Sequence, residues 1–149
     1  MEDECVWVRK RITDSTFLSD EEIDIMNSLT GKIELSIIER NAYDNLRERQ
    51  SLIGNEFLNL TKKEGRTNSE NQLYERCFSN LFAIECNMLN KMNEQVLLQR
   101  YDLFKSREAE LPVMGKLISL PAIEITLKKR GILESDKESN IVDNARPRL

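Results

Sequence analysis

The sequence predicts an all-α fold: a long antiparallel helical hairpin, similar to a coiled coil, with a short C-terminal helix or hairpin and a disordered tail. Two observations predict this fold. From Ser19 to Leu111 the chain contains no proline, and only three glycines interrupt this stretch. Apolar residues recur along it at steps of three and four, which places their side chains on one face of a helix. The length of 149 residues suits one domain.

The first arm of the hairpin is expected over residues 19–63. Ser19 and Glu22 match a capping box, in which each side chain accepts a hydrogen bond from a backbone N–H of the first turn. Apolar residues then follow in two registers. These are Met26, Leu29, Ile33 and Ile37, and after them Tyr43, Leu46, Gln50, Ile53, Phe57 and Leu60.

The step between Ile33 and Tyr43 does not fit a continuous heptad, which indicates that the helix changes its packing neighbour there. We expect the helix to continue through Gly31, because the apolar stripe from Leu29 to Ile33 crosses it. The alternative is that Gly31 ends a short first helix at Thr30.

A turn and a second arm are expected next. Lys62, Lys63 and Gly65 are typical of a helix end, since Gly65 suits the left-handed residue that follows a helix. Ser69–Gln72 matches a second capping box, so the second helix is expected over 69–111 and is closed by Pro112. So short a connection predicts antiparallel neighbours.

The second arm is apolar over more than one face between Phe78 and Met92. A lone hairpin cannot cover that width, which predicts a third element or a partner beside it. Residues 112–133 are apolar and are expected to form a short helix, with Pro121 in its first turn and Gly131 after its end. A strand is the alternative, because Ile123, Ile125 and Leu127 alternate.

Two terminal segments complete the organisation. Residues 1–18 form a leader that contains Trp7, the single tryptophan. Trp7 either docks into a partner's groove or packs on the protein's own helices. Residues 134–149 are polar and without a pattern, so they are expected to be disordered.

Composition argues against an enzyme. The chain has no histidine, which excludes catalytic triads and dyads that use imidazole. Glycine-rich phosphate loops are absent. The three cysteines (Cys5, Cys77 and Cys86) form no CxxC pair. We therefore expect no catalytic residue, no metal site and no cofactor.

Charge and hydropathy bound the partners. The 22 basic and 26 acidic residues are interspersed and give a net charge of −4, which argues against nucleic acid as the main partner. No apolar run approaches the ~20 residues of a membrane-spanning helix, and no signal peptide is expected. These features, together with free thiols, predict an intracellular protein of the cytoplasm or nucleus.

These observations predict a non-enzymatic helical interaction subunit, an adaptor or scaffold that binds partner helices through its surplus apolar faces. Other proteins in a hetero-oligomeric complex are the expected partners, with a homodimer as the alternative. The alternative function is a homodimeric four-helix-bundle regulator that contacts nucleic acid or an acidic surface through Lys128, Lys129 and Arg130. The candidate partner-binding residues are Trp7, Phe57, Phe78, Phe82, Met88 and Ile123.

Overall fold

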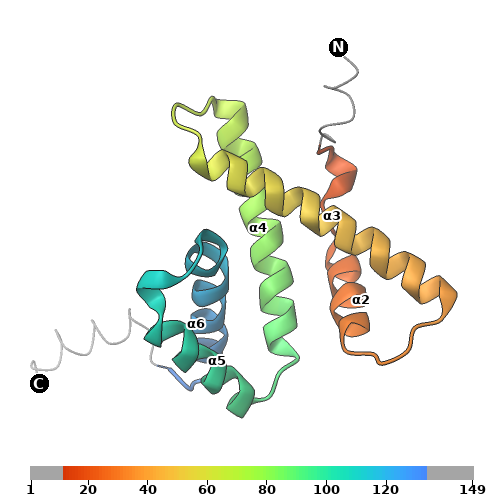
Figure 1. The fold of residues 1–149 in the computed structure, drawn as a ribbon, viewed down its shortest axis with the longest axis vertical. Coiled ribbons are helices and arrows are strands. Elements are labelled where there is room, and N and C mark those ends of the chain that lie inside the picture. The colour runs from red at the N-terminus through yellow and green to blue at the C-terminus, as the bar shows by residue number, and fades with distance from the viewer. Residues whose placement is uncertain (1–11, 134–149) are drawn as a thin grey trace, which may run out of the picture. The chain divides into compact units, whose positions relative to one another are not determined.

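A computed structural model describes residues 12–133, and within that range the chain forms only helices and their connections (Figure 1). The prediction of an all-α fold is confirmed. The chain divides into unit 1, up to Met88, and unit 2, from Leu89 onward. Unit 1 contains η1 (Asp14–Thr16), α2 (Asp20–Thr30), α3 (Ile37–Lys62) and nearly all of α4 (Asn68–Asn90). Unit 2 contains α5 (Glu94–Ser106), η2 (Glu108–Glu110), the π-helical turn η3 (Gly115–Ser119) and α6 (Leu120–Lys129).

The prediction of one continuous first arm over 19–63 is wrong. The capping box of Ser19 and Glu22 forms as expected, but α2 ends at Thr30 and α3 begins at Ile37. Ser36 and Glu39 form a further capping box that starts α3. The irregular step in the apolar pattern therefore marks a loop between two helices, and not a drifting stripe along one.

The prediction of one continuous second arm over 69–111 is also wrong. The helix is divided into α4 and α5, and the Asn93 side chain caps α5 by accepting a hydrogen bond from the Val96 N–H at 2.9 Å. The capping box at the start of α4 uses Thr67 and Glu70, two residues before the predicted one. α5 ends at Ser106, before Pro112 is reached.

The connection between α3 and α4 contains the left-handed residue that the sequence predicts, Gly65, with a φ of +69°. Gly31, after α2, has an ordinary φ of −89°. A Cβ atom at either glycine would meet nothing within 4 Å. The two glycines therefore differ in backbone conformation and not in the room available for a side chain.

Gly65→Ala is therefore expected to lower the free energy of unfolding by about 1–2 kcal/mol, because an L-residue is strained at positive φ. Gly31→Ala is the matched control, and it should leave stability unchanged or raise it by less than about 1 kcal/mol. Urea unfolding followed by circular dichroism measures both variants. Equal effects from the two would contradict this account.

The packing of unit 1 does not confirm the predicted antiparallel hairpin. α2 contacts α3, and α3 crosses α4 (Figure 1). At the crossing the Phe57 ring stacks on Tyr74, with ring centroids 5.0 Å apart, and a tilted contact to Phe78 spans 6.2 Å. Phe57 is completely buried, as are Met26, Ile53 and Cys77.

The segment from η1 into α2 runs parallel to α4, as its long-range contacts show. Asp14 pairs with Arg76 at 2.7 Å, the Leu18 backbone bonds to the Asn80 side chain, and Asn27 donates to the Ile84 carbonyl at 3.0 Å. Residue numbers rise together along both partners. This N-terminal segment therefore lies beside α4, and its α2 part belongs to the predicted first arm over 19–63.

Unit 2 confirms the prediction that the segment 112–133 is helical. η3 and α6 occupy most of it, with Pro121 in the first turn of α6 and Gly131 left-handed after its end. The Leu120 N–H bonds to the Gly115 carbonyl, which is the spacing of a π-helix. The buried apolar residues of unit 2 are Leu89, Leu97, Ile118, Leu120, Ala122, Ile123 and Leu127.

Candidate functional site

Three isoleucines at the junction of α2 and α3 are nearly fully exposed. Ile33 in the loop is 98% exposed, and Ile37 and Ile38 in the first turn of α3 are each 81% exposed. We call these three residues the isoleucine tip. Other exposed large apolar residues, such as Ile25 at 48% and Leu103 at 52%, keep about half of their surface covered. The isoleucine tip is therefore the most exposed group of large apolar side chains in residues 12–133.

Local hydrogen bonds hold the backbone of the tip. At the end of α2 the Thr30 hydroxyl donates to the Met26 carbonyl at 3.0 Å. The Lys32 N–H then donates to the Leu29 carbonyl, also at 3.0 Å, and its ammonium group pairs with Glu39 at 2.7 Å. Since Glu39 also belongs to the capping box of α3, one carboxylate joins both ends of the loop. The isoleucines are therefore presented on an ordered turn.

The junction of α3 and α4 is built from the same contacts. The Thr61 hydroxyl donates to the Phe57 carbonyl, the Lys63 N–H donates to the Leu60 carbonyl, and the Lys63 ammonium pairs with Glu70. Each of these residues of the first junction has a counterpart in the second junction, always the same number of positions further along the chain. The matching pairs are Leu29 and Leu60, Thr30 and Thr61, Lys32 and Lys63, Ser36 and Thr67, Glu39 and Glu70, and Tyr43 and Tyr74.

The comparison of the two junctions shows which side chains the local hydrogen bonds of the turn require. At the same offset, the positions of Ile33, Ile37 and Ile38 are taken in the second junction by Glu64, Asn68 and Ser69, all exposed. The same local hydrogen bonds therefore form with polar residues at these three positions. The isoleucine side chains are therefore not required for these hydrogen bonds, and they lie outside the core.

Each capping glutamate in unit 1 also receives a basic side chain. The Arg49 guanidinium, assisted by the Ser19 N–H, lowers the pKa of Glu22 from its usual value near 4.5. Lys32 and the Ser36 N–H lower the pKa of Glu39 in the same way, and Lys63 and the Thr67 N–H lower the pKa of Glu70.

Acid is therefore expected to destabilise unit 1. A carboxylate whose pKa is lower in the folded state contributes stability that is present above the unfolded pKa and lost as pH falls through the folded pKa. The urea midpoint should stay nearly constant from pH 8 to 6, since the chain has no histidine, and fall below about pH 4.5. The variant Glu22→Gln/Glu39→Gln/Glu70→Gln should show a shallower acid decline. An unchanged decline in this variant would contradict the assignment.

The structure places the sequence-predicted binding residues mostly in or beside the cores. Phe57 and Ile123 are completely buried, so neither forms an exposed surface. Phe78, Phe82 and Met88 on α4 are half-buried, and the rings of Phe78 and Phe82 stack at 5.5 Å. Trp7 lies outside the described residues.

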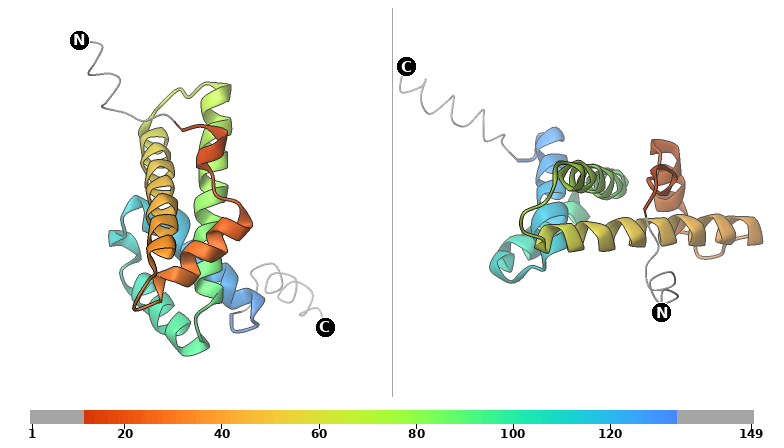
Figure 2. Two further views of the ribbon diagram at one scale, coloured as in Figure 1. Left: turned by 90° about the vertical axis from the view of Figure 1, so that its right-hand side faces the viewer. Right: turned by 90° about the horizontal axis from the view of Figure 1, so that it is seen from above.

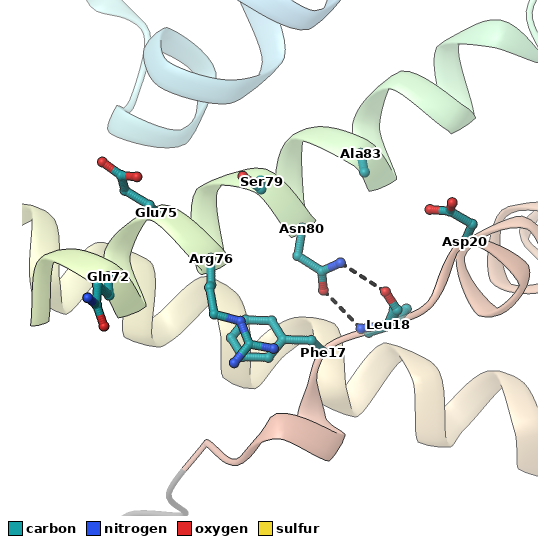
Figure 3. Close-up of a pocket in the computed structure, with 9 residues that line it drawn as sticks. All are labelled: Phe17, Leu18, Asp20, Gln72, Glu75, Arg76, Ser79, Asn80 and Ala83. Carbon is teal, nitrogen blue, oxygen red and sulfur yellow. Dashed lines mark hydrogen bonds between the residues drawn. The ribbon is translucent and has the colours of Figure 1, made fainter. Parts of the chain in front are cut away.

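A second surface feature is an open groove of about 760 Å³ beside α4 (Figure 3). The Arg76 guanidinium lies 4.2 Å above the Phe17 ring, and the Asn80 amide both donates to and accepts from the Leu18 backbone at 3.0 Å. These side chains already bind the N-terminal segment to α4. The groove is therefore explained by the folding of unit 1.

Acidic, thiol and basic side chains occur throughout residues 12–133. Within that range no three histidine, cysteine or acidic side chains form a metal-binding group. Burial, together with the charge of Glu56, raises the pKa of the Cys77 thiol to about 11, so it stays protonated at neutral pH. In the basic run at the end of α6, the Arg130 guanidinium donates to the Asn90 carbonyl at 3.1 Å. None of the helices in this range is long and apolar enough to span a membrane.

Comparisons of the chain with protein-family models, with curated proteins and with solved structures found no match. The candidate site therefore depends on the geometry alone.

Sequence reasoning missed the isoleucine tip because Ile33 and Ile37 continue the spacing of Met26 and Leu29. The signal that locates them was present as Ser36 followed by Glu39, a capping box that starts a new helix. Combined with Gly31, it places Ile33 in a loop.

Proposed function

We propose that the chain is a non-enzymatic helical interaction subunit, an adaptor or scaffold that binds other protein chains through its isoleucine tip. The exposure of Ile33, Ile37 and Ile38 supports this proposal, because the equivalent junction of the same chain carries polar residues there. An apolar cluster on a turn that does not need it serves recognition of another surface.

The binding surface proposed here is the isoleucine tip, which is smaller than the broad apolar face of α4 that the sequence predicts as a binding surface. Phe57 and its aromatic neighbours are engaged within unit 1, whereas the tip side chains are not. The loop between α2 and α3 lies at one end of both helices (Figure 2), and the three isoleucines at this junction are exposed. Presentation on an ordered turn lowers the entropy lost on binding.

Site-specific photocrosslinking tests the proposal. A benzoylphenylalanine placed at position 37 of the full chain in cells should give defined protein adducts. The same group at position 68, the equivalent position of the second junction, is the matched control and should give few or none. Adducts of the same identity and yield from both positions, or no adducts from position 37, would contradict the proposal.

A polar-tip variant, Ile33→Glu/Ile37→Asn/Ile38→Ser, separates binding from folding. It copies the residues of the second junction, so its helical content should match the wild type and its melting temperature should shift by less than about 2 °C. Circular dichroism measures both quantities, and crosslinking from nearby position 41 should be reduced at least tenfold. Leu103→Ser, which removes an exposed leucine elsewhere, should leave crosslinking unchanged.

A further inference from the structure

We propose that the isoleucine tip binds a second copy of this chain, forming a two-fold symmetric, tip-to-tip dimer. This inference rests on the proposed function and names the partner of the same surface. It is carried by the charges around the tip and by the size of the apolar patch.

The charges around the tip are self-complementary. Glu34 follows Ile33 directly, and Arg40 lies one helical turn after Ile37. Both side chains are exposed, and neither forms an ion pair within residues 12–133. In a two-fold symmetric contact each pair of residues occurs twice, once in each direction. Glu34 of each copy therefore meets Arg40 of the other. A partner surface that carries charges of one sign only would pair with just one of these two side chains.

The charge of the rest of unit 1 favours contact at the tip. Residues 12–88 contain fourteen acidic and eight basic side chains, so unit 1 of one copy repels unit 1 of another outside a neutral contact. Residues 31–41 are electrically balanced, with Lys32 and Arg40 against Glu34 and Glu39. The tip is thus an apolar and neutral site on an acidic unit, where a second copy approaches with little repulsion.

The size of the patch sets the strength of the dimer. Three isoleucines with a charged rim bury less than the roughly 800 Å² per partner of a standard complex. The dimer is therefore weak and reversible, with a dissociation constant on the order of 0.1 mM. It forms where the local concentration of the chain is high.

Analytical ultracentrifugation of the purified full chain, from about 10 µM to 1 mM, tests the inference. The wild type should shift from monomer to dimer over this range, and the polar-tip variant should stay monomeric at 1 mM with an unchanged circular dichroism spectrum. A wild type that stays monomeric at 1 mM overturns the inference, as does a dimer that survives in the polar-tip variant.

A charge swap tests the two-fold pairing. Glu34→Arg and Arg40→Glu should each weaken dimerisation about fivefold or more, because each brings like charges together at two places. The double variant Glu34→Arg/Arg40→Glu should restore the dissociation constant to within about twofold of the wild type. Failure of the double variant to recover overturns the pairing of these residues.

The two proposals fail in different ways. If the purified chain is monomeric at 1 mM while position 37 crosslinks to a different protein in cells, the self-association is wrong and the proposed function stands. If the crosslinked adduct has twice the mass of the chain, both stand. If neither experiment shows a tip-dependent contact, both are overturned.

Discussion

Phe57→Ala is expected to lower the free energy of unfolding of unit 1 by about 3–5 kcal/mol, the loss typical of a buried aromatic residue. Phe57 has no exposed surface, stacks on Tyr74 and touches Phe78 where α3 crosses α4. Alanine would leave a cavity between these rings. A domain is stable by about 5–15 kcal/mol, so the variant should be close to unfolding at 37 °C.

Urea unfolding monitored by circular dichroism and by hydrogen exchange in α3 and α4 measures the loss. Phe57→Leu should lose less, because leucine fills more of the space. Leu103→Ala, which truncates a half-exposed side chain, should stay within about 0.5 kcal/mol of the wild type. A loss below about 1 kcal/mol in Phe57→Ala would show that the crossing is not the core of unit 1.

Arg49→Ala is expected to destabilise unit 1 by about 2–3 kcal/mol, the second largest effect. The guanidinium donates to the Thr16 carbonyl at 3.1 Å and to the Phe17 carbonyl at 2.8 Å, and it binds both carboxylate oxygens of Glu22 at 2.9 and 3.0 Å. Its side chain is 19% exposed. Alanine would release the N-terminal segment from α3.

The Arg49→Ala substitution should therefore accelerate hydrogen exchange more in residues 16–23 than in α6. Arg49→Lys should recover only part of the stability, since an ammonium group cannot replace the planar, bidentate fork. Arg47→Ala is the matched control on the same helix. Arg47 bonds only to Gln50 at the surface and lies 5.9 Å from the Tyr43 ring, so its loss should stay within about 0.5 kcal/mol. Equal effects of the two alanine variants would contradict the role of Arg49.

Local signals in the sequence predicted the local structure well. The Ser19 capping box, the left-handed Gly65 and the C-terminal helix with its early Pro121 are set by residues within one or two turns, and all three form. At Gly31 the alternative, a helix that ends at Thr30, is correct, although the apolar stripe across Gly31 favoured continuity. The interruption at Asn93 was not predicted, because no proline marks it.

Packing could not be predicted from the same signals. A short connection at Gly65 permits two helices to lie antiparallel or to cross, and the contacts of Phe57 decide between them. The N-terminal segment takes its place on α4 through Asn80 and Arg76, whose sequence neighbours give no sign of a partner 62 residues away. The isoleucine tip was hidden for a related reason, since periodicity alone does not distinguish buried from exposed apolar residues.

The parallel alignment of the N-terminal segment with α4 determines when unit 1 can form during synthesis. Leu18 bonds to Asn80 across 62 positions, and Asn27 bonds to Asn87 across 60. A growing chain that has released α2 and α3 from the ribosome lacks Tyr74 and Phe78, so Phe57 stays uncovered until α4 emerges. The chain then loses the entropy of this long loop at the same time as it gains the contacts of α4. Unit 1 is accordingly completed only when α4, its last helix, leaves the exit tunnel.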